Sequence, residues 1–177
     1  MSSGLSFGYI IFVMSKKGSS KKGDDQKHWP RITNRRARYD YHLLEKIEAG
    51  IELRGTEVKS LREGRASLDG AYAQIRNGEV FLCGATIAEY PQAAGALQHD
   101  PTRDRKLLLH SREIRKLQAH VQQKGHTIIP LAIYFRRGWA KCELATAVGK
   151  RKYDKRHVIQ EREMEREIQR EISRRKK

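Results

Sequence analysis

Short runs in which hydrophobic and polar residues alternate flank the dipeptide Asn77-Gly78. A two-residue loop of this composition favours a type I′ turn, because both central residues tolerate positive φ angles. Such a turn fixes the register of the two strands that it connects. The predicted opposite pairs are Arg76 with Glu79, Ile75 with Val80, and Ala73 with Leu82. The sequence therefore predicts a β-hairpin with one apolar face and one more polar face.

Further extended segments lie on both sides of this hairpin. Before it, residues 38–47 and 50–54 have the composition of strands, with an interruption at Ala49 and Gly50. After it, the stretch TIIPLAIYF, residues 127–135, is followed by a turn at Arg136-Arg137-Gly138 and by a second strand, WAKCELA. Pro130 predicts an edge position or a bulge in the first of these strands. The side chains expected to point inward are Ile129, Leu131, Ile133 and Phe135, and then Ala140, Cys142 and Leu144.

Two helices are predicted from apolar spacing and end signals. The first covers TEVKSLREG, with Thr56 as N-cap and Gly64 beyond its C-terminus. The second has about 14 residues, is capped by Ser111 and stops at Gly125. Residues 88–105 between the hairpin and the second helix are expected to form a long loop. The positions expected to be buried are Val58 and Leu61 in the first helix, and Ile114, Leu117 and Val121 in the second.

These elements predict a mainly β fold with flanking helices. Several short antiparallel strands and one inserted helix, in a body of about 115 residues, favour a small barrel of the oligonucleotide-binding (OB) type. A split β-α-β sheet is the alternative, and periodicity alone does not separate the two. The predicted organisation is a flexible basic extension over residues 1–33, an OB-type barrel over residues 34–148, and a basic tail over residues 149–177.

Charge is distributed unevenly along the 177 residues. Residues 1–38 hold 9 Lys and Arg against 2 Asp and Glu, and the tail holds 12 against 6, whereas the part between them holds 16 against 13. Two basic arms on a nearly balanced centre suit a nucleic-acid backbone that is contacted from more than one side. A membrane surface is a poorer fit, because the apolar stripe of the tail is narrow and has no Trp, Phe or Leu anchor.

The tail has the pattern of an amphipathic helix. Met164, Ile168 and Ile172 form a thin apolar stripe, and a row of arginines at positions 162, 166, 170 and 174 lies roughly 160° around the helix from it. Because an isolated helix of this length is marginal in water, the tail is expected to be disordered when free and helical when a polyanion neutralises it. A solvated terminal helix without a partner is the alternative.

The N-terminal segment carries the apolar run GYIIFV, which is too short for a transmembrane helix and has no basic segment before it. We expect translation to start at Met14. Only Cys83 and Cys142 are present, with no CxxC spacing, so the sequence indicates neither a disulfide framework nor a zinc site. A reduced cytoplasmic protein is the simplest interpretation.

Catalytic motifs are lacking. The seven histidines are scattered, and the chain has neither a phosphate-binding loop nor a nucleophile elbow. The sequence therefore predicts no catalytic residue, no metal site and no cofactor. One enzymatic alternative is a metal-dependent ribonuclease that uses Glu48, Glu57 and Asp100, since carboxylates distant in sequence can converge on a metal.

Binding residues are better indicated. Lys141 and Trp139 share the outward face of one strand and couple a cation with a stacking surface, as RNA-binding barrels do. In the alternative, Trp139 packs under the central helix and the Lys141 stem lies along apolar surface. Glu48 is an acceptor-only carboxylate that suits a base edge or a ribose, although a surface ion pair with a nearby lysine is by itself the more common explanation of such a residue.

Three sequence blocks resemble the small protein B family, the tmRNA-binding proteins of bacterial trans-translation. They are IEAGIELRGTEVKSLREG (residues 47–64), DPTRDRKLLLHSREI (100–114) and GKRKYDKR (149–156), in the family's order. The resemblance runs from about Asn34 to the tail. It implies an OB-type barrel and a non-enzymatic adaptor that binds the tRNA-like part of tmRNA. It also implies delivery to stalled 70S ribosomes, where the tail folds in the vacant mRNA channel on ribosomal RNA, and contact with elongation factor Tu through the tmRNA.

The resemblance also implies specific residues. The tmRNA-binding positions fall on Glu48, Leu108 and Lys141, to which the sequence pattern adds Trp139. Val148 departs from the family pattern, which often has Lys there, so one cationic contact is expected to be missing. A constitutive rRNA-binding protein of the ribosomal or initiation type is the main functional alternative. The expected ribosome-engaging residues of the tail are Gly149, Lys150, Arg151, Tyr153, Asp154, Lys155 and Arg156.

Overall fold

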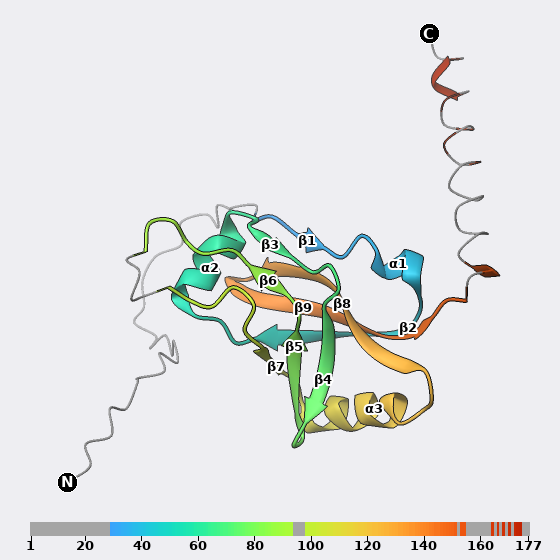
Figure 1. The fold of residues 1–177 in the computed structure, drawn as a ribbon, viewed down its shortest axis with the longest axis horizontal. Helices are drawn as coiled ribbons and strands as arrows, with labels where there is room; N and C mark the ends of the chain where they lie inside the picture. Colours follow the sequence, from blue (N-terminus) through green and yellow to red (C-terminus); the bar gives the residue numbers. More distant parts are fainter. Residues whose placement is uncertain are drawn as a thin grey trace.

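A computed structural model describes residues 29–93, 98–151 and 153–154, together with positions 164, 166, 168, 170 and 172–174 of the tail. The body consists mostly of strands, with helices before β2, before β3 and before β8 (Figure 1). The strands are β1 (Ile32–Thr33), β2 (Tyr41–Ile51), β3 (Ala66–Ser67), β4 (Tyr72–Arg76), β5 (Glu79–Cys83), β6 (Thr86–Ile87), β7 (Arg105–Leu108), β8 (His126–Arg136) and β9 (Trp139–Gly149). The helices are α1 (Ala37–Asp40), α2 (Gly55–Arg62) and α3 (Ser111–Val121).

The main sheet closes on itself. Its strand order is β1-β8-β4-β5-β7-β2-β9, and an additional pairing of β8 with β9 joins its two sides. All its pairings are antiparallel, and β3 with β6 forms a separate two-stranded sheet. The interior is filled by apolar side chains that include Leu82, Ile133 and Leu144. The closed antiparallel barrel confirms the predicted fold class and excludes the split-sheet alternative.

Both predicted hairpin turns are confirmed. The β4–β5 pairs are Arg76 with Glu79, Ile75 with Val80, and Ala73 with Leu82, as the Asn77-Gly78 turn requires. Asn77 and Gly78 have φ angles of 52° and 77°. The β8–β9 hairpin has the same geometry, because Arg137 and Gly138 have φ angles of 50° and 80° and Arg136 pairs with Trp139. Local turn chemistry therefore fixes two of the barrel's strand pairs.

The segment before the hairpin differs from its prediction. Residues 38–47 and 50–54 are not two separate pieces, because β2 runs without a break through Ala49 and Gly50 and the short helix α1 precedes it. The folded body also begins earlier than Asn34. Ile32 and Thr33 pair with β8, so these residues belong to the barrel and not to a flexible extension.

Both main helices start earlier than their hydroxyl residues suggest, by two residues in α2 and by one residue in α3. Arg54 and His110 are the N-caps, and in each helix a glutamate three positions later accepts the N-cap N–H. Thr56 does not cap α2, because its hydroxyl bonds to the His99 ring, with 2.8 Å between Oγ1 and Nδ1. The loop predicted over residues 88–105 includes the first residue of β7, Arg105, which is fully buried.

The buried positions of the helices follow the predicted spacing only in part. Leu61 and Leu117 are fully buried, and Ile114 packs against the core from a half-buried position. Val58 is half-buried, while Val121 is exposed at the end of α3, which has 11 residues in place of about 14. Figure 1 shows α2 and α3 at separate ends of the barrel.

Strand β8 contains the bulge that Pro130 predicts, since its register with β9 shifts between Pro130 and Ala132. An extra residue reverses the alternation of side chains. Ile133 and Phe135 therefore face the main core as expected, whereas Ile129 and Leu131 pack into a second apolar cluster with Ala37 and Ala147. Ile128 takes the main-core position before the bulge. The prediction that all four residues share one interior was wrong for this reason.

Candidate nucleic-acid interface

A groove of about 660 Å³ runs along the outer face of β2 beside α3. We call it the β2–α3 groove. Three residues that the sequence singles out line it: Glu48 from β2, Leu108 from β7 and Lys141 from β9. Leu108 is 53% exposed although it is apolar, so the groove offers a hydrophobic contact beside charged groups. The other lining residues are Glu45, Lys46, Ile47, Gly50, Leu109, His110, Glu113 and Lys116.

Gly50 explains how residues from three strands meet here. It pairs with Leu108 on one side and with Lys141 on the other. A Cβ atom at Gly50 would come within 3.2 Å of the Leu108 Cβ atom, which is tighter than an ordinary contact. The missing side chain thus lets Leu108 lie close over β2.

A second β2 irregularity joins the groove to α3. The pairing of β2 with β9 shifts register between Leu43 and Lys46, and the Glu45 N–H within this shift donates to Thr146 Oγ1. Glu45 contacts two α3 side chains: the Lys116 Nζ atom forms an ion pair, 3.6 Å from one carboxylate oxygen, and the His120 Nε2 atom lies 3.5 Å from the other oxygen. The bulge therefore anchors the helix that forms one wall of the groove.

Glu48 is held by three neighbours. The Tyr134 hydroxyl donates a hydrogen bond to Glu48 Oε2, and the Arg136 Nη1 atom lies 3.4 Å from the same oxygen. Lys141 Nζ is 3.7 Å from Oε1. The Tyr134 hydrogen bond and the two cations outweigh desolvation and hold the pKa of Glu48 below its ordinary value. At neutral pH this carboxylate is therefore an acceptor for hydroxyl or amino groups.

Two of these neighbours were missed by sequence reasoning. Tyr134 and Arg136 belong to β8, distant in sequence from Glu48. The two-residue turn at Arg137-Gly138 implies that Tyr134 lies opposite Lys141, as the structure shows. The sequence could therefore have placed Tyr134 opposite Lys141. It could not have placed Glu48 beside Tyr134, because β2 and β9 pair with each other although they are distant in the sequence.

Trp139 lies apart from the groove lining, at the tip of the β8–β9 hairpin, and is 66% exposed. The alternative in which it packs under the central helix is therefore wrong. The sequence left open an ion pair between Glu48 and a nearby lysine, and Lys141 forms this pair. The pair does not remove Glu48 from the groove, because its side chain remains 33% exposed.

The start of the tail is attached to the barrel. Gly149 is the last residue of β9, and Lys150 donates from Nζ to the Arg38 carbonyl and from its backbone N–H to the Asp40 carbonyl. Asp154 accepts the Arg151 N–H, and its carboxylate lies 3.5 Å from the His42 ring. These contacts lower the pKa of Asp154, with the backbone hydrogen bond as the main cause.

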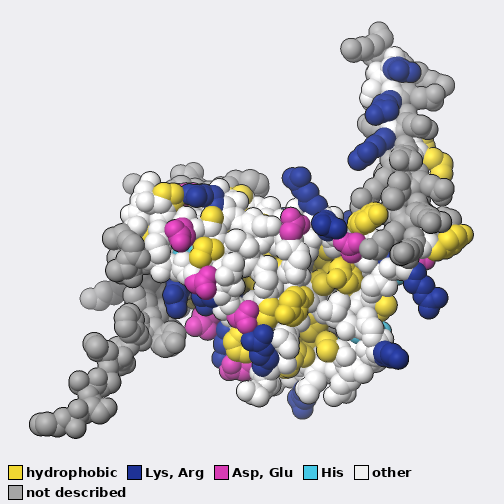
Figure 2. Space-filling view, viewed as in Figure 1, with side chains coloured by type: hydrophobic (Ala, Val, Ile, Leu, Met, Phe, Trp, Pro, Cys, Tyr) yellow, Lys and Arg dark blue, Asp and Glu magenta, His cyan; other side chains and the backbone are white. Residues whose placement is uncertain are grey.

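Other tail residues complete this picture. Tyr153 is exposed, whereas Lys155 and Arg156 lie outside the described residues. The described positions from Met164 to Arg174 are helical and exposed. Figure 2 shows basic side chains along one side of this segment, as the arginine spacing predicts.

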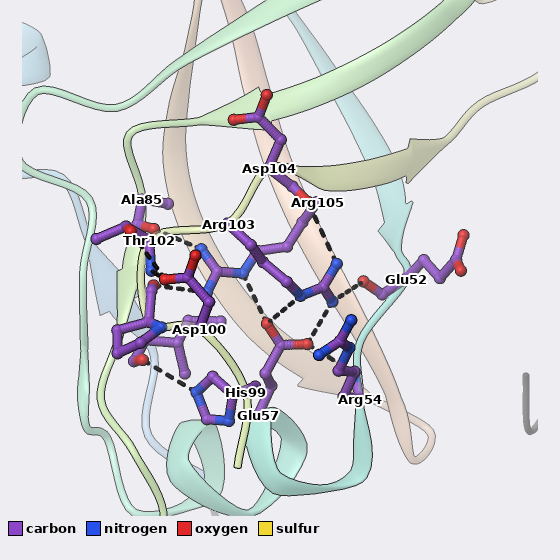
Figure 3. Close-up of polar contacts among 12 residues, drawn as sticks. Glu52, Arg54, Glu57, Ala85, His99, Asp100, Thr102, Arg103, Asp104 and Arg105 are labelled. Atoms are coloured by element: carbon purple, nitrogen blue, oxygen red, sulfur yellow. Dashed lines mark hydrogen bonds and ion pairs between the residues drawn. The ribbon is translucent and has the colours of Figure 1, made fainter. Parts of the chain in front are cut away.

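A second carboxylate from the same sequence block, Glu57, is fully buried, and Figure 3 shows the arginine side chains that surround it. It accepts hydrogen bonds from the side chains of Arg103 and Arg105 and from the Arg54 N–H. Burial would raise the pKa of Glu57, but these hydrogen bonds outweigh burial and lower it. Arg105 also donates to the carbonyls of Ala85 and Pro101. This cluster joins α2 to the start of β7.

The ribonuclease alternative required Glu48, Glu57 and Asp100 to act together. Glu48 and Glu57 instead have separate sets of partners, and Asp100 accepts from the N–H and hydroxyl of Thr102. In the described part of the chain, no group of three or more His, Cys, Asp or Glu side chains could hold a metal ion. Within the same residues, no helix has the length and apolar character needed to cross a membrane.

Comparison with known proteins decides the family. A family model described as SmpB protein matches residues 31–174. The chain belongs to the SmpB family. An SsrA-binding protein of Thermobifida fusca (strain YX) is 53% identical over 150 residues, covering 85% of this chain and 92% of the relative. One from Trichodesmium erythraeum (strain IMS101) is 48% identical over 145 residues, covering 82% and 92%.

A solved structure agrees with this family assignment. A chain from the work described as "tmRNA-SmpB: a journey to the center of the bacterial ribosome" is 48% identical and has a TM-score of 0.60. The match covers 73% of this chain and 94% of that one. The barrel described above is thus the fold of an SmpB-family protein.

Proposed function

We propose that this chain binds tmRNA and brings it to stalled ribosomes for trans-translation, as an adaptor without chemistry of its own. The observation that carries the proposal is the β2–α3 groove, which unites Glu48, Leu108 and Lys141 in a chain whose relatives are SsrA-binding proteins. An ionised carboxylate, an exposed leucine and a lysine can contact ribose hydroxyls, an unstacked base and a phosphate, respectively. The site of action is the cytoplasm, with elongation factor Tu reached through the tmRNA.

The tail has a separate role in this proposal. From Gly149 onward it carries 12 Lys and Arg against 6 Asp and Glu, and its described arginines are exposed. Basic side chains bind ribosomal RNA without sequence preference and release counterions. The groove therefore selects the RNA partner, while the tail, with Gly149, Lys150, Arg151, Tyr153, Asp154, Lys155 and Arg156 at its start, engages the empty mRNA channel.

Sequencing the RNA that copurifies with the natively expressed protein tests the proposal directly. Enrichment of tmRNA over its cellular share is expected. Ribosomal RNA in equal amounts from all ribosomes, with no tmRNA enrichment, would instead indicate a constitutive ribosomal protein and would overturn the proposal.

A truncation separates the two roles. A chain that ends at Val148 should keep its affinity for tmRNA and lose tagging of stalled peptides. As a matched pair, Arg166, Arg170 and Arg174 are changed together to Lys or to Gln. The Lys variant keeps the charge and should keep tagging, whereas the Gln variant should lose much of it. Tagging by the truncated chain would refute the role of the tail.

A further inference from the structure

Tyr134 occupies a particular place beside the groove. It comes from β8, whereas Glu48 comes from β2, and β9 lies between these two strands. The Tyr134 side chain therefore reaches across the outer face of β9 to contact Glu48. Tyr134 itself is not among the residues that line the groove.

The two oxygens of Glu48 have different surroundings. Oε2 accepts from the Tyr134 hydroxyl and lies 3.4 Å from Arg136 Nη1. Within the described part of the chain, Oε1 has only the ion pair with Lys141, at 3.7 Å, which is too long for a hydrogen bond. A carboxylate oxygen can accept about two hydrogen bonds. Oε1 therefore keeps the capacity to accept from a ligand.

Tyr134 is in turn braced by its own neighbours. The Arg31 guanidinium lies over the tyrosine ring, 4.8 Å from the ring centre, and Arg31 is ion-paired with Glu143. Lys46 Nζ lies 3.5 Å from Glu143 as well. These contacts hold the ring in place, so the hydroxyl has a defined direction.

We infer that Tyr134 is a positioning residue for RNA binding: its hydroxyl fixes one oxygen of Glu48, so that the other faces a hydrogen-bond donor of the RNA. The inference rests on the proposed function. Because the carboxylate can only accept and repels phosphate, the matching RNA group is a ribose 2′-hydroxyl or a base amino group.

The protonation states agree with these roles. Burial, together with the Glu48 hydrogen bond, raises the pKa of Tyr134 to about 12, so the phenol keeps its proton at neutral pH and donates it. Since the pKa of Glu48 is lowered, mainly by that same hydrogen bond, its carboxylate is ionised there. The pair is therefore a donor and an acceptor throughout the physiological range.

Tyr134→Phe removes the hydroxyl and keeps the ring under Arg31. With a transcript of the tRNA-like part of tmRNA as the probe, we expect the dissociation constant to rise about 5- to 15-fold. Tyr72→Phe is the matched control, because Tyr72 is an exposed tyrosine on β4 that does not line the β2–α3 groove, and it should bind as the wild type does. Unchanged far-UV circular dichroism excludes a folding defect.

A double-mutant cycle tests whether Tyr134 acts through Glu48. If it does, Tyr134→Phe should weaken binding no further once Glu48→Ala is present. Additive losses would mean that Tyr134 contacts the RNA itself, and they would overturn the inference. So would a wild-type affinity of Tyr134→Phe alongside weak binding by Glu48→Ala, although the proposed function would then stand.

A measurement without RNA separates the inference from the proposed function. NMR titration of the Glu48 carboxyl group in the free protein should give a higher pKa in Tyr134→Phe than in the wild type, because a hydrogen bond to the charged form is lost. An unchanged pKa would overturn the contact. If the wild type bound no tmRNA, the proposed function would fail by itself, and this titration would still decide whether Tyr134 controls Glu48.

Discussion

Glu48 and Glu57 belong to the same short sequence block and have similar chemical partners, yet they have opposite environments. Each carboxylate is contacted by two cationic side chains. Glu57 is fully buried and accepts well-aligned hydrogen bonds from Arg54, Arg103 and Arg105. Glu48 is partly exposed, and its cations lie 3.4 and 3.7 Å away.

This difference in burial assigns Glu57 to the stability of the fold and Glu48 to the recognition of a partner. All acceptors of a buried carboxylate must be satisfied inside the protein, because no water or ligand can reach it. Glu57 meets this requirement and thereby fixes α2 against β7. Glu48 meets it only in part, so one oxygen remains available to a partner. Residues of one motif block can therefore serve the fold or the RNA, and burial distinguishes the two roles.

The largest expected effect comes from Glu57→Ala. Removing this carboxylate leaves the buried Arg105 without its counter-charge, which typically costs about 3–5 kcal/mol of unfolding free energy. Chemical denaturation measures the loss. The matched control is Glu63→Ala, which removes a half-exposed glutamate at the end of the same helix and should leave stability close to that of the wild type. Equal stability of both variants would remove the distinction drawn between Glu57 and Glu48.

The two arginines around Glu57 should differ from each other. Arg105 has no exposed side-chain surface and bonds to two carbonyls besides Glu57, so Arg105→Met should cost about 3 kcal/mol. The Arg103 side chain is 23% exposed, and in Arg103→Met the contact between Arg105 and Glu57 remains. The expected loss of unfolding free energy is therefore about 1 kcal/mol. Denaturation midpoints at constant slope give both values. A larger loss for Arg103 would contradict the ranking by burial.

Much of this architecture follows from local chemistry that the sequence displays. The Asn77-Gly78 and Arg137-Gly138 turns set their strand registers, because turn geometry depends on only a few residues. The bulge at Pro130 has the same local origin. The continuity of β2 through Gly50 was not predictable, because the close approach of Leu108 that uses this glycine joins segments distant in the chain.

The candidate site was predictable only in outline. The resemblance to the small protein B family indicated Glu48, Leu108 and Lys141, and these three residues line the β2–α3 groove. The arrangement around Glu48 depends on how β2, β9 and β8 lie side by side, which pattern alone does not give. Thr56 shows a further limit: its position suggests a helix cap, but the buried His99 uses its hydroxyl.

Acid should affect the Glu57 cluster by a smaller amount. The folded-state pKa of Glu57 lies below its unfolded value, so its contribution to stability is present above the unfolded pKa and is lost as the pH falls through the folded pKa. Arg103→Met removes the main hydrogen bond that lowers this pKa, so its unfolding free energy should fall less between about pH 5 and pH 3 than that of the wild type, by about 1 kcal/mol. Glu63→Gln is the control and should keep the wild-type slope. If the unfolding free energies of Arg103→Met and the wild type changed in parallel with pH, Arg103 would not be the cause of the lowered pKa of Glu57.

The smallest expected effect on stability belongs to Glu48→Gln. Its ion pairs are partly exposed, and such pairs contribute little, so the unfolding free energy should stay within about 0.5 kcal/mol of the wild type. The same change neutralises the carboxylate in the β2–α3 groove, and the affinity for the tRNA-like part of tmRNA should fall about 10-fold, since hydrogen bonds to a charged acceptor are the stronger ones. Denaturation and RNA titration on one preparation separate the two quantities. Glu79→Gln removes another exposed glutamate that is paired with a lysine and should change neither. If Glu48→Gln lost as much stability as Glu57→Ala, Glu48 would also hold the barrel together. That outcome would contradict the separate roles of the two carboxylates, because a group with a free acceptor site for RNA cannot be an essential internal counter-ion.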